Sequence, residues 1–233
     1  MRIAIISDIH SNLEALTRAF RLIDQNNIDA VVCTGDIVGY GANPNECVAL
    51  IRQRTSHILR GNHDDAAVNL SRIDEFSSLA QMVAHWTNEV LHPDNKKFLQ
   101  SLPLTLDLGD VFFTHASPYE PEEWHYIFSS EDAQNNFSWF VQPICFVGHT
   151  HRPVIHCDDG ISLNVKRGKR YIINVGSIGQ PRDFDWRLSF GIFDTLAWTY
   201  ENVRAEYDVQ SASDQIIAHG LPPALAERIL FGR

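Results

Sequence analysis

The sequence predicts a layered α/β protein, with either one mixed sheet or two packed sheets flanked by helices. Short apolar runs alternate with longer amphipathic stretches along the chain. The first half has the order strand–helix–strand, which predicts parallel pairing, whereas the later runs predict mostly antiparallel pairing. With 233 residues, 44% of them hydrophobic, the chain is expected to form a single domain over residues 1–233.

Each element is predicted from its apolar pattern and its end signals. Leu13, Leu16 and Phe20 recur at helical spacing behind a capping box that begins at Ser11, and Asn43 caps the next helix with Pro44 in its first turn. The predicted strands are 3–6, 30–33, 56–59, 105–108, 111–114, 144–147, 154–157, 171–174, 189–195 and 198–203. The predicted helices are 11–25, one that begins at 43, 76–91, 95–102, 212–219 and 224–230.

Composition excludes several classes of protein. No stretch approaches the ~20 apolar residues of a membrane span, and the apolar start is too short for a signal peptide, so a cytoplasmic protein without membrane attachment is expected. The four cysteines show no paired spacing, which argues against a disulfide framework. A net charge of −10 opposes binding of long nucleic acid.

Residues capable of binding metal follow the predicted strands, at the edge where ligands bind in open α/β sheets. Glycine precedes three of them, at points where the backbone must turn sharply and approach an ion closely. Taken singly, Asp8 could serve as a helix cap and Asn62 as a turn residue. Taken together, the set indicates a metal centre: Asp8, His10, Asp36, Asn62, His115, His149 and His151.

Seven side chains exceed what one tetrahedral ion takes, so the set predicts two divalent ions. If one carboxylate bridges, each ion receives four protein ligands, and Asp36 is the best bridge because it is central in the order. Imidazole without thiolate favours Mn, Fe, Co, Ni or Zn over Mg or Ca. The pairs Asp8/His10 and His149/His151 are two residues apart, and in extended chain each pair would point to one side.

The motifs around these residues resemble those of the calcineurin-like metallophosphoesterase superfamily. They occur in the order of the family and span residues 8–151. A later segment, from Asn174 to Arg182, is similar to the smaller prokaryotic phosphodiesterases of that superfamily. The motifs are Asp8-Ile9-His10, Gly35-Asp36-Ile37-Val38-Gly39, Gly61-Asn62-His63-Asp64, His115 and Gly148-His149-Thr150-His151.

The resemblance implies a four-layer α/β/β/α sandwich of two mixed sheets and a metal-dependent phosphoesterase activity. It also implies how the ligands divide. One ion would be held by Asp8, His10, Asp36 and His151, and the other by Asp36, Asn62, His115 and His149.

One departure from the family pattern bears on the substrate. Ser/Thr protein phosphatases of the superfamily carry Asp-Arg-Gly shortly after the second motif, where this chain has Gly39-Tyr40-Gly41. A small phosphodiester or nucleotide-type substrate is therefore favoured over a phosphoprotein. The expected nucleophile is a hydroxide that bridges the ions, and His63, directly after Asn62, is the expected general acid.

Contacts to the substrate are less sharply indicated. The Arg182 guanidinium is suited to bind phosphate oxygens. Tyr40 and Asn43 follow the loop of Asp36 closely enough to touch a substrate. The segment Asp183–Arg187 is interpreted either as a substrate lip or as a subunit contact, and the oligomeric state is left open. A non-catalytic scaffold on the same fold is the alternative; loss of ligands would mark it, and this chain keeps all seven and His63.

Overall fold

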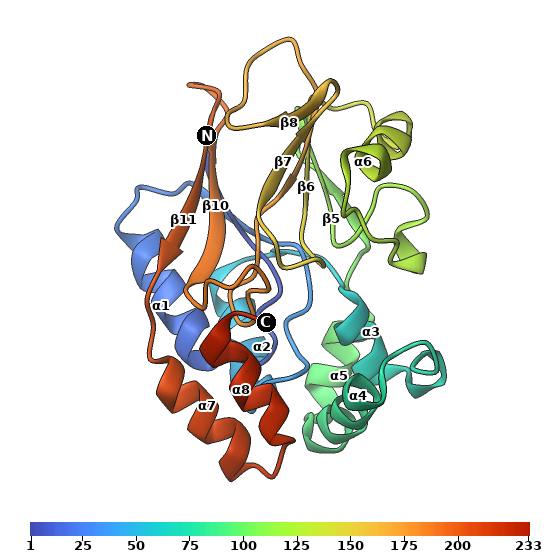
Figure 1. The fold of residues 1–233 in the computed structure, drawn as a ribbon, viewed down its shortest axis with the longest axis vertical. Helices are drawn as coiled ribbons and strands as arrows, with labels where there is room; N and C mark the ends of the chain where they lie inside the picture. Colours follow the sequence, from blue (N-terminus) through green and yellow to red (C-terminus); the bar gives the residue numbers. More distant parts are fainter.

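Two sheets lie face to face between layers of helices in the computed structural model, which describes residues 1–233 (Figure 1). The first sheet has the order β11-β10-β1-β2-β3 and the second the order β4-β5-β6-β9-β7-β8. The strands of the first are β1 (Arg2–Ile6), β2 (Ala30–Cys33), β3 (His57–Ile58), β10 (Leu188–Asp194) and β11 (Thr199–Ala205). Those of the second are β4 (Thr105–Asp107), β5 (Val111–Thr114), β6 (Ile144–Val147), β7 (Val154–Cys157), β8 (Gly160–Ser162) and β9 (Tyr171–Asn174).

The layers follow from the two-residue alternation of strand side chains. In β1, Ile3 and Ile5 enter the core between the sheets, whereas Ala4 and Ile6 enter the core under the helices of the first sheet. In β6, Phe146 belongs to the core between the sheets. The alternation of apolar residues on both faces makes each central strand an apolar run, as the sequence predicts.

Helices cover both outer faces and complete four layers (Figure 1). The core beneath the first sheet takes residues from most of the helices, and α6 covers the second sheet through Ala133. No helix is both long and apolar enough to cross a membrane. The helices are α1 (Leu13–Asp24), α2 (Pro44–Arg54), α3 (Asn62–Val68), α4 (Ser78–Val90), α5 (Pro93–Gln100), α6 (Ser130–Asn136), α7 (Val209–Ala218) and α8 (Pro223–Phe231).

Several local expectations were wrong. The first helix is capped by Asn12, whose side chain accepts from Ala15 N–H, and not by Ser11, whose φ of +55° lies in the left-handed region. The helices α3 and α6 and the strand β8 were not expected, because seven residues or fewer carry too little periodicity to detect. The second half is also less antiparallel than predicted, since β5, β6 and β9 pair in parallel.

Parallel pairing directs several strand ends to the same side of the molecule. The strands β1, β2 and β3 run parallel in one sheet, and β5 and β6 run parallel in the other. The loops that leave these strands carry the motifs, and they meet between the two sheets. The fold therefore delivers polar side chains from five separate loops to one place.

Candidate active site

Four of the predicted ligands form one tight group of buried donor atoms. Donor atoms of Asp8, His10, Asp36 and His151 lie within 4.8 Å of one another. His151 Nε2 is 3.2 Å from Asp8 Oδ1, and His10 Nε2 is 3.6 Å from Asp36 Oδ2. All four side chains are almost fully excluded from solvent.

A second group shares Asp36 with the first. Donor atoms of Asp36, His115 and His149 lie within 4.8 Å of one another. Asp36 Oδ2 is 3.4 Å from His115 Nε2, and Asn62 Oδ1 is 3.1 Å from the same nitrogen. The structure thus brings all seven predicted residues together, with Asp36 between the two groups.

The hydrogen bonds of the imidazoles orient their lone pairs toward the site. Nδ1 of His10 bonds to the carbonyl of Val38, and Nδ1 of His115 to that of Thr34. His151 Nδ1 likewise bonds to the Gln180 carbonyl. A carbonyl only accepts, so each Nδ1 carries a proton, and in a neutral ring the Nε2 lone pair is free to bind a metal.

The same contacts show that the site is short of positive charge. His10 Nε2 and His151 Nε2 face each other at 3.0 Å, and with both rings neutral two lone pairs oppose each other. Asp36 Oδ2 and His149 Nε2 are buried without any hydrogen-bond partner. Because an unpaired buried polar atom is costly, this donor set fits divalent cations bound at both groups.

The backbone at the site is held in an unfavourable conformation. Five of the seven residues have positive φ: +52° at Asp8, +49° at His10, +54° at Asp36, +66° at His149 and +60° at His151. The left-handed region costs a non-glycine residue about 1–2 kcal/mol, and such strain concentrates at functional sites. It also corrects the expectation of extended segments: the paired donors meet because the chain turns at each of them.

Close approach of the loops explains the glycines. A Cβ on Gly61 would lie 2.1 Å from Asp36 Oδ1, and one on Gly148 would lie 1.9 Å from Ser7 Oγ. Asp64 joins the loops further, because its carboxylate accepts from the N–H groups of Gly61, Ile37 and Val38. Asp64 thus caps the start of α3 and holds that helix against the loop of Ile37 and Val38.

His63 lies beside the two groups on the first turn of α3. Its N–H donates to Asp36 Oδ1 at 2.8 Å, and its ring packs against Tyr40 and Phe76 at centroid distances of 4.4 and 5.0 Å. Burial lowers the pKa of His63 to about 4. The imidazole is therefore neutral at pH 7 until a neighbouring anion raises its pKa.

A proton on His115 offsets part of the negative charge of the site. Burial disfavours the charged form of His115, but the carboxylates of Asp36, Asp8 and Asp64 together outweigh burial and raise the pKa of His115 to about 9. Burial lowers the pKa of His149 to about 3. Burial and the charge of Asp36 raise the pKa of Asp64 to about 7.

A cavity of about 470 Å³ opens beside His63. Tyr40 and Arg182, two of the three predicted substrate contacts, line it, and the Arg182 guanidinium carbon lies 5.7 Å from the Tyr40 ring centre. The lining residues that sequence reasoning missed include Tyr126, Arg228 and Arg233, which no motif marks. Tyr126 stacks on His149 at a centroid distance of 4.0 Å.

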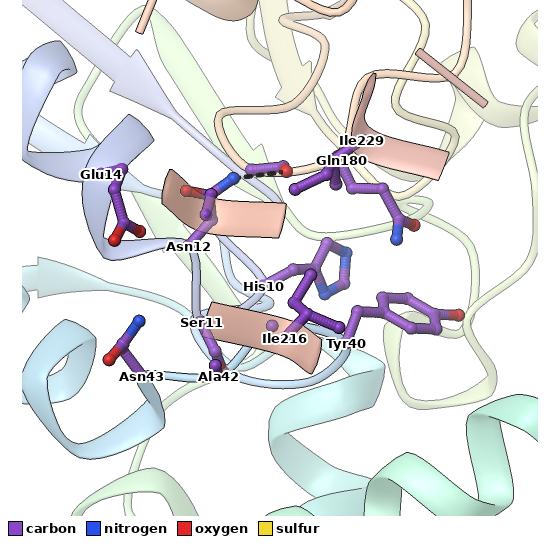
Figure 2. Close-up of a pocket in the computed structure, with 13 residues that line it drawn as sticks. His10, Ser11, Asn12, Glu14, Tyr40, Ala42, Asn43, Gln180, Ile216 and Ile229 are labelled. Carbon is purple, nitrogen blue, oxygen red and sulfur yellow. Dashed lines mark hydrogen bonds between the residues drawn. The ribbon is translucent and has the colours of Figure 1, made fainter. Parts of the chain in front are cut away.

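The third predicted contact, Asn43, lies elsewhere. It precedes α2 and lines a separate small pocket with Asn12 and Glu14 (Figure 2). That pocket has a free volume of about 10 Å³, room for at most one water molecule. Asn43 follows Asp36 by only seven residues, but it does not line the cavity beside His63 and so does not share that cavity with Tyr40 and Arg182.

Fold and site together define a calcineurin-like phosphoesterase, and the chain belongs to that superfamily: the model of the calcineurin-like phosphoesterase superfamily domain matches residues 1–197. Among its relatives, the uncharacterized protein MJ0912 of Methanocaldococcus jannaschii is 41% identical, with 99% of this chain and 98% of the relative covered.

Solved structures agree with this assignment. A metallophosphoesterase from Sphaerobacter thermophilus is 38% identical, with 100% of this chain and 99% of the other covered and a TM-score of 0.90. The hypothetical protein PH1004 from Pyrococcus horikoshii OT3 is 19% identical, with 100% and 98% covered and a TM-score of 0.86, which shows the shared fold.

The approach of the loops gives a prediction about Gly61. Gly61→Ala places a methyl group 2.1 Å from Asp36 Oδ1 and 2.4 Å from Asp36 N, so the loops must separate. We expect the free energy of unfolding to fall by about 3 kcal/mol, measured by urea denaturation. The control, Gly168→Ala, has no atom within 4 Å and only a φ of +84° to resist it, and should cost about 1 kcal/mol. Equal losses would contradict the steric argument.

Proposed function

We propose that this protein is a dimetal phosphoesterase that hydrolyses phosphodiester or nucleotide-type substrates. The observation that carries the proposal is the position of Asp36, whose unpartnered Oδ2 lies within 3.6 Å of imidazole nitrogens from both groups. One ion would be held by Asp8, His10, Asp36 and His151, and the other by Asp36, Asn62, His115 and His149. Imidazole-rich sites without thiolate suit Mn, Fe, Co, Ni or Zn.

When bound, the two ions lower the pKa of a water molecule and neutralise charge on the phosphoryl oxygens. The protein's own residues hold the surrounding geometry. Backbone carbonyls fix the rings of His10, His115 and His151, and Asp64 fixes the loops around Asp36. The rigidity of this frame keeps the phosphate and the attacking water aligned.

We assign the leaving-group proton to His63. Its imidazole lies at the wall of the cavity and outside both donor groups. A phosphate anion beside the ring would raise its low pKa toward neutrality, which lets it carry a proton in the complex and donate it to the leaving oxygen.

The walls of the cavity support an organic phosphate as the substrate. Tyr40, Phe76 and Tyr126 supply aromatic surface, and Arg182 supplies a cation. A flat group such as a nucleobase stacks on aromatic rings, while guanidinium binds phosphate oxygens.

We also propose that residues 1–233 form one domain, although the family match ends at residue 197. The strand β11 pairs with β10 over seven residues, and helices α7 and α8 share the large core with α1.

An activity panel on metal-reconstituted protein tests the function. It compares a phosphomonoester, a phosphodiester, dinucleoside polyphosphates, cyclic nucleotides and a phosphopeptide by kcat/KM. We expect the highest values among the phosphodiesters and nucleotides. A preference for the monoester and the phosphopeptide would overturn the substrate class, and no hydrolysis at all would overturn the function.

Removal of the shared carboxylate tests the metal centre. Asp36→Asn should release both ions, because Asp36 belongs to both groups, whereas the unchanged protein should hold two ions per chain by elemental analysis. Asp65→Asn is the control, since Asp65 is another buried carboxylate, on α3, but faces Arg60 at 3.5 Å and belongs to neither donor group. Retention of two ions by Asp36→Asn would contradict a bridging role.

Replacement of His63 tests proton donation. His63→Asn should keep both ions and lower kcat by ~10²–10⁴-fold, the usual contribution of a general acid. The loss should be larger for a nucleoside ester than for a nitrophenyl ester, because nitrophenolate leaves without a proton. His125→Asn, at an exposed ring outside the cavity, is the control. An unchanged rate on the nucleoside ester would refute the assignment.

A further inference from the structure

Three arginines line the cavity beside His63 and have no carboxylate partner. They are Arg182, Arg228 on α8 and Arg233. None of them takes part in any ion pair of the protein. In a chain with 29 acidic against 19 basic residues, three unpaired guanidinium groups around one cavity are a marked local reversal of charge.

The charge of the lining is correspondingly positive. Glu75 is the one acidic residue among those that line the cavity, and it forms no ion pair with the arginines. Three guanidinium groups and one carboxylate give the lining side chains a formal charge of +2 with His63 neutral. Such a concave, positive lining attracts and retains anions.

The segment that carries Arg228 and Arg233 is held in place. Gly232 C=O accepts from Phe184 N–H at 2.9 Å, and Arg233 N–H donates to Arg228 C=O at 3.0 Å. Gly232 has a φ of +64°, and a Cβ there would meet Asp185 N at 2.7 Å. The segment therefore packs against the loop Asp183–Arg187, which holds it in place.

The scissile phosphate does not account for these arginines. The two donor groups and His63 already surround the place where that phosphate would bind, and Arg228 and Arg233 belong to a segment beyond residue 197, where the family match ends. Cations beyond the first phosphate are useful when the substrate carries a second one, because guanidinium binds phosphate oxygens in pairs.

We propose that Arg228 and Arg233, together with Arg182, form a subsite for a second phosphate group, so that the preferred substrate is a nucleotide-type phosphoester with an additional phosphate. This inference rests on the proposed function and names the substrate class for the same site. The aromatic wall of Tyr40, Phe76 and Tyr126 would hold the organic part between the two phosphates.

A pair of chromogenic esters tests the subsite. Thymidine 5′-(p-nitrophenyl phosphate) and its 3′-phosphorylated form share one leaving group and differ by one phosphate. We expect the metal-loaded protein to prefer the 3′-phosphorylated ester by at least about tenfold in kcat/KM, with the difference in KM. In Arg228→Gln/Arg233→Gln, the loss should be at least about tenfold greater for the 3′-phosphorylated ester than for the other.

Controls separate charge, fold and function. Arg228→Lys/Arg233→Lys should retain part of the preference, and Arg21→Gln/Lys97→Gln, which removes the same charge from exposed positions outside the cavity, should retain all of it. A preference that is absent, or that survives in Arg228→Gln/Arg233→Gln, overturns the subsite. Failure to hydrolyse either ester overturns the proposed function instead.

Binding gives a readout that needs no turnover and no metal. Calorimetric titration of the metal-free protein should show thymidine 3′,5′-bisphosphate bound at least about tenfold more tightly than thymidine 5′-phosphate, and this margin should shrink with added salt. Arg233→Gln alone should reduce the margin, which covers the case in which the double variant does not fold. Equal affinities of the two nucleotides would count against the subsite even if both esters are hydrolysed.

Discussion

The buried carboxylate of Asp36 is the constraint around which the rest of this site is built. Its Oδ1 accepts from His63 N–H, while its Oδ2 has no hydrogen-bond partner and faces imidazoles on two sides. A buried carboxylate needs compensating positive charge. Without metal, the raised pKa of His115 supplies it as a proton; with metal, the cations replace that proton, so metal binding and deprotonation are coupled.

The strain of the surrounding loops follows from the same requirement. Five residues in left-handed conformation and two unpaired buried atoms raise the free energy of the site, and the packed sheets must offset it. The core between the sheets, with fully buried Phe113 and Phe146, lies directly behind the loops that end β5 and β6. The stabilising apolar core thus lies next to the loops whose backbone conformation is least favourable.

The sequence predicted the strands other than β8, and the convergence of the seven candidate ligands, because both follow from local pattern. Apolar runs alternate between two cores, and each candidate ligand follows a strand end. It did not place Asn43 in its separate pocket, because a position seven residues after Asp36 does not imply a shared cavity once the backbone turns at Tyr40. Tyr126, Arg228 and Arg233 carry no local signal, since packing of distant elements alone brings them to the cavity.

In the proposed function, the residues for the reaction and the residues that select the substrate come from different parts of this chain. The donor atoms come from strand-end loops between residues 8 and 151, inside the matched family domain, whereas two of the three arginines come from α8 and the residues after it. Because α8 is anchored in the large core through Leu225 and Ile229, it can present different side chains to the cavity without disturbing the loops that carry the candidate metal ligands. Under the proposed function, substrate specificity can therefore change on α8 while the loops that carry the candidate metal ligands stay fixed.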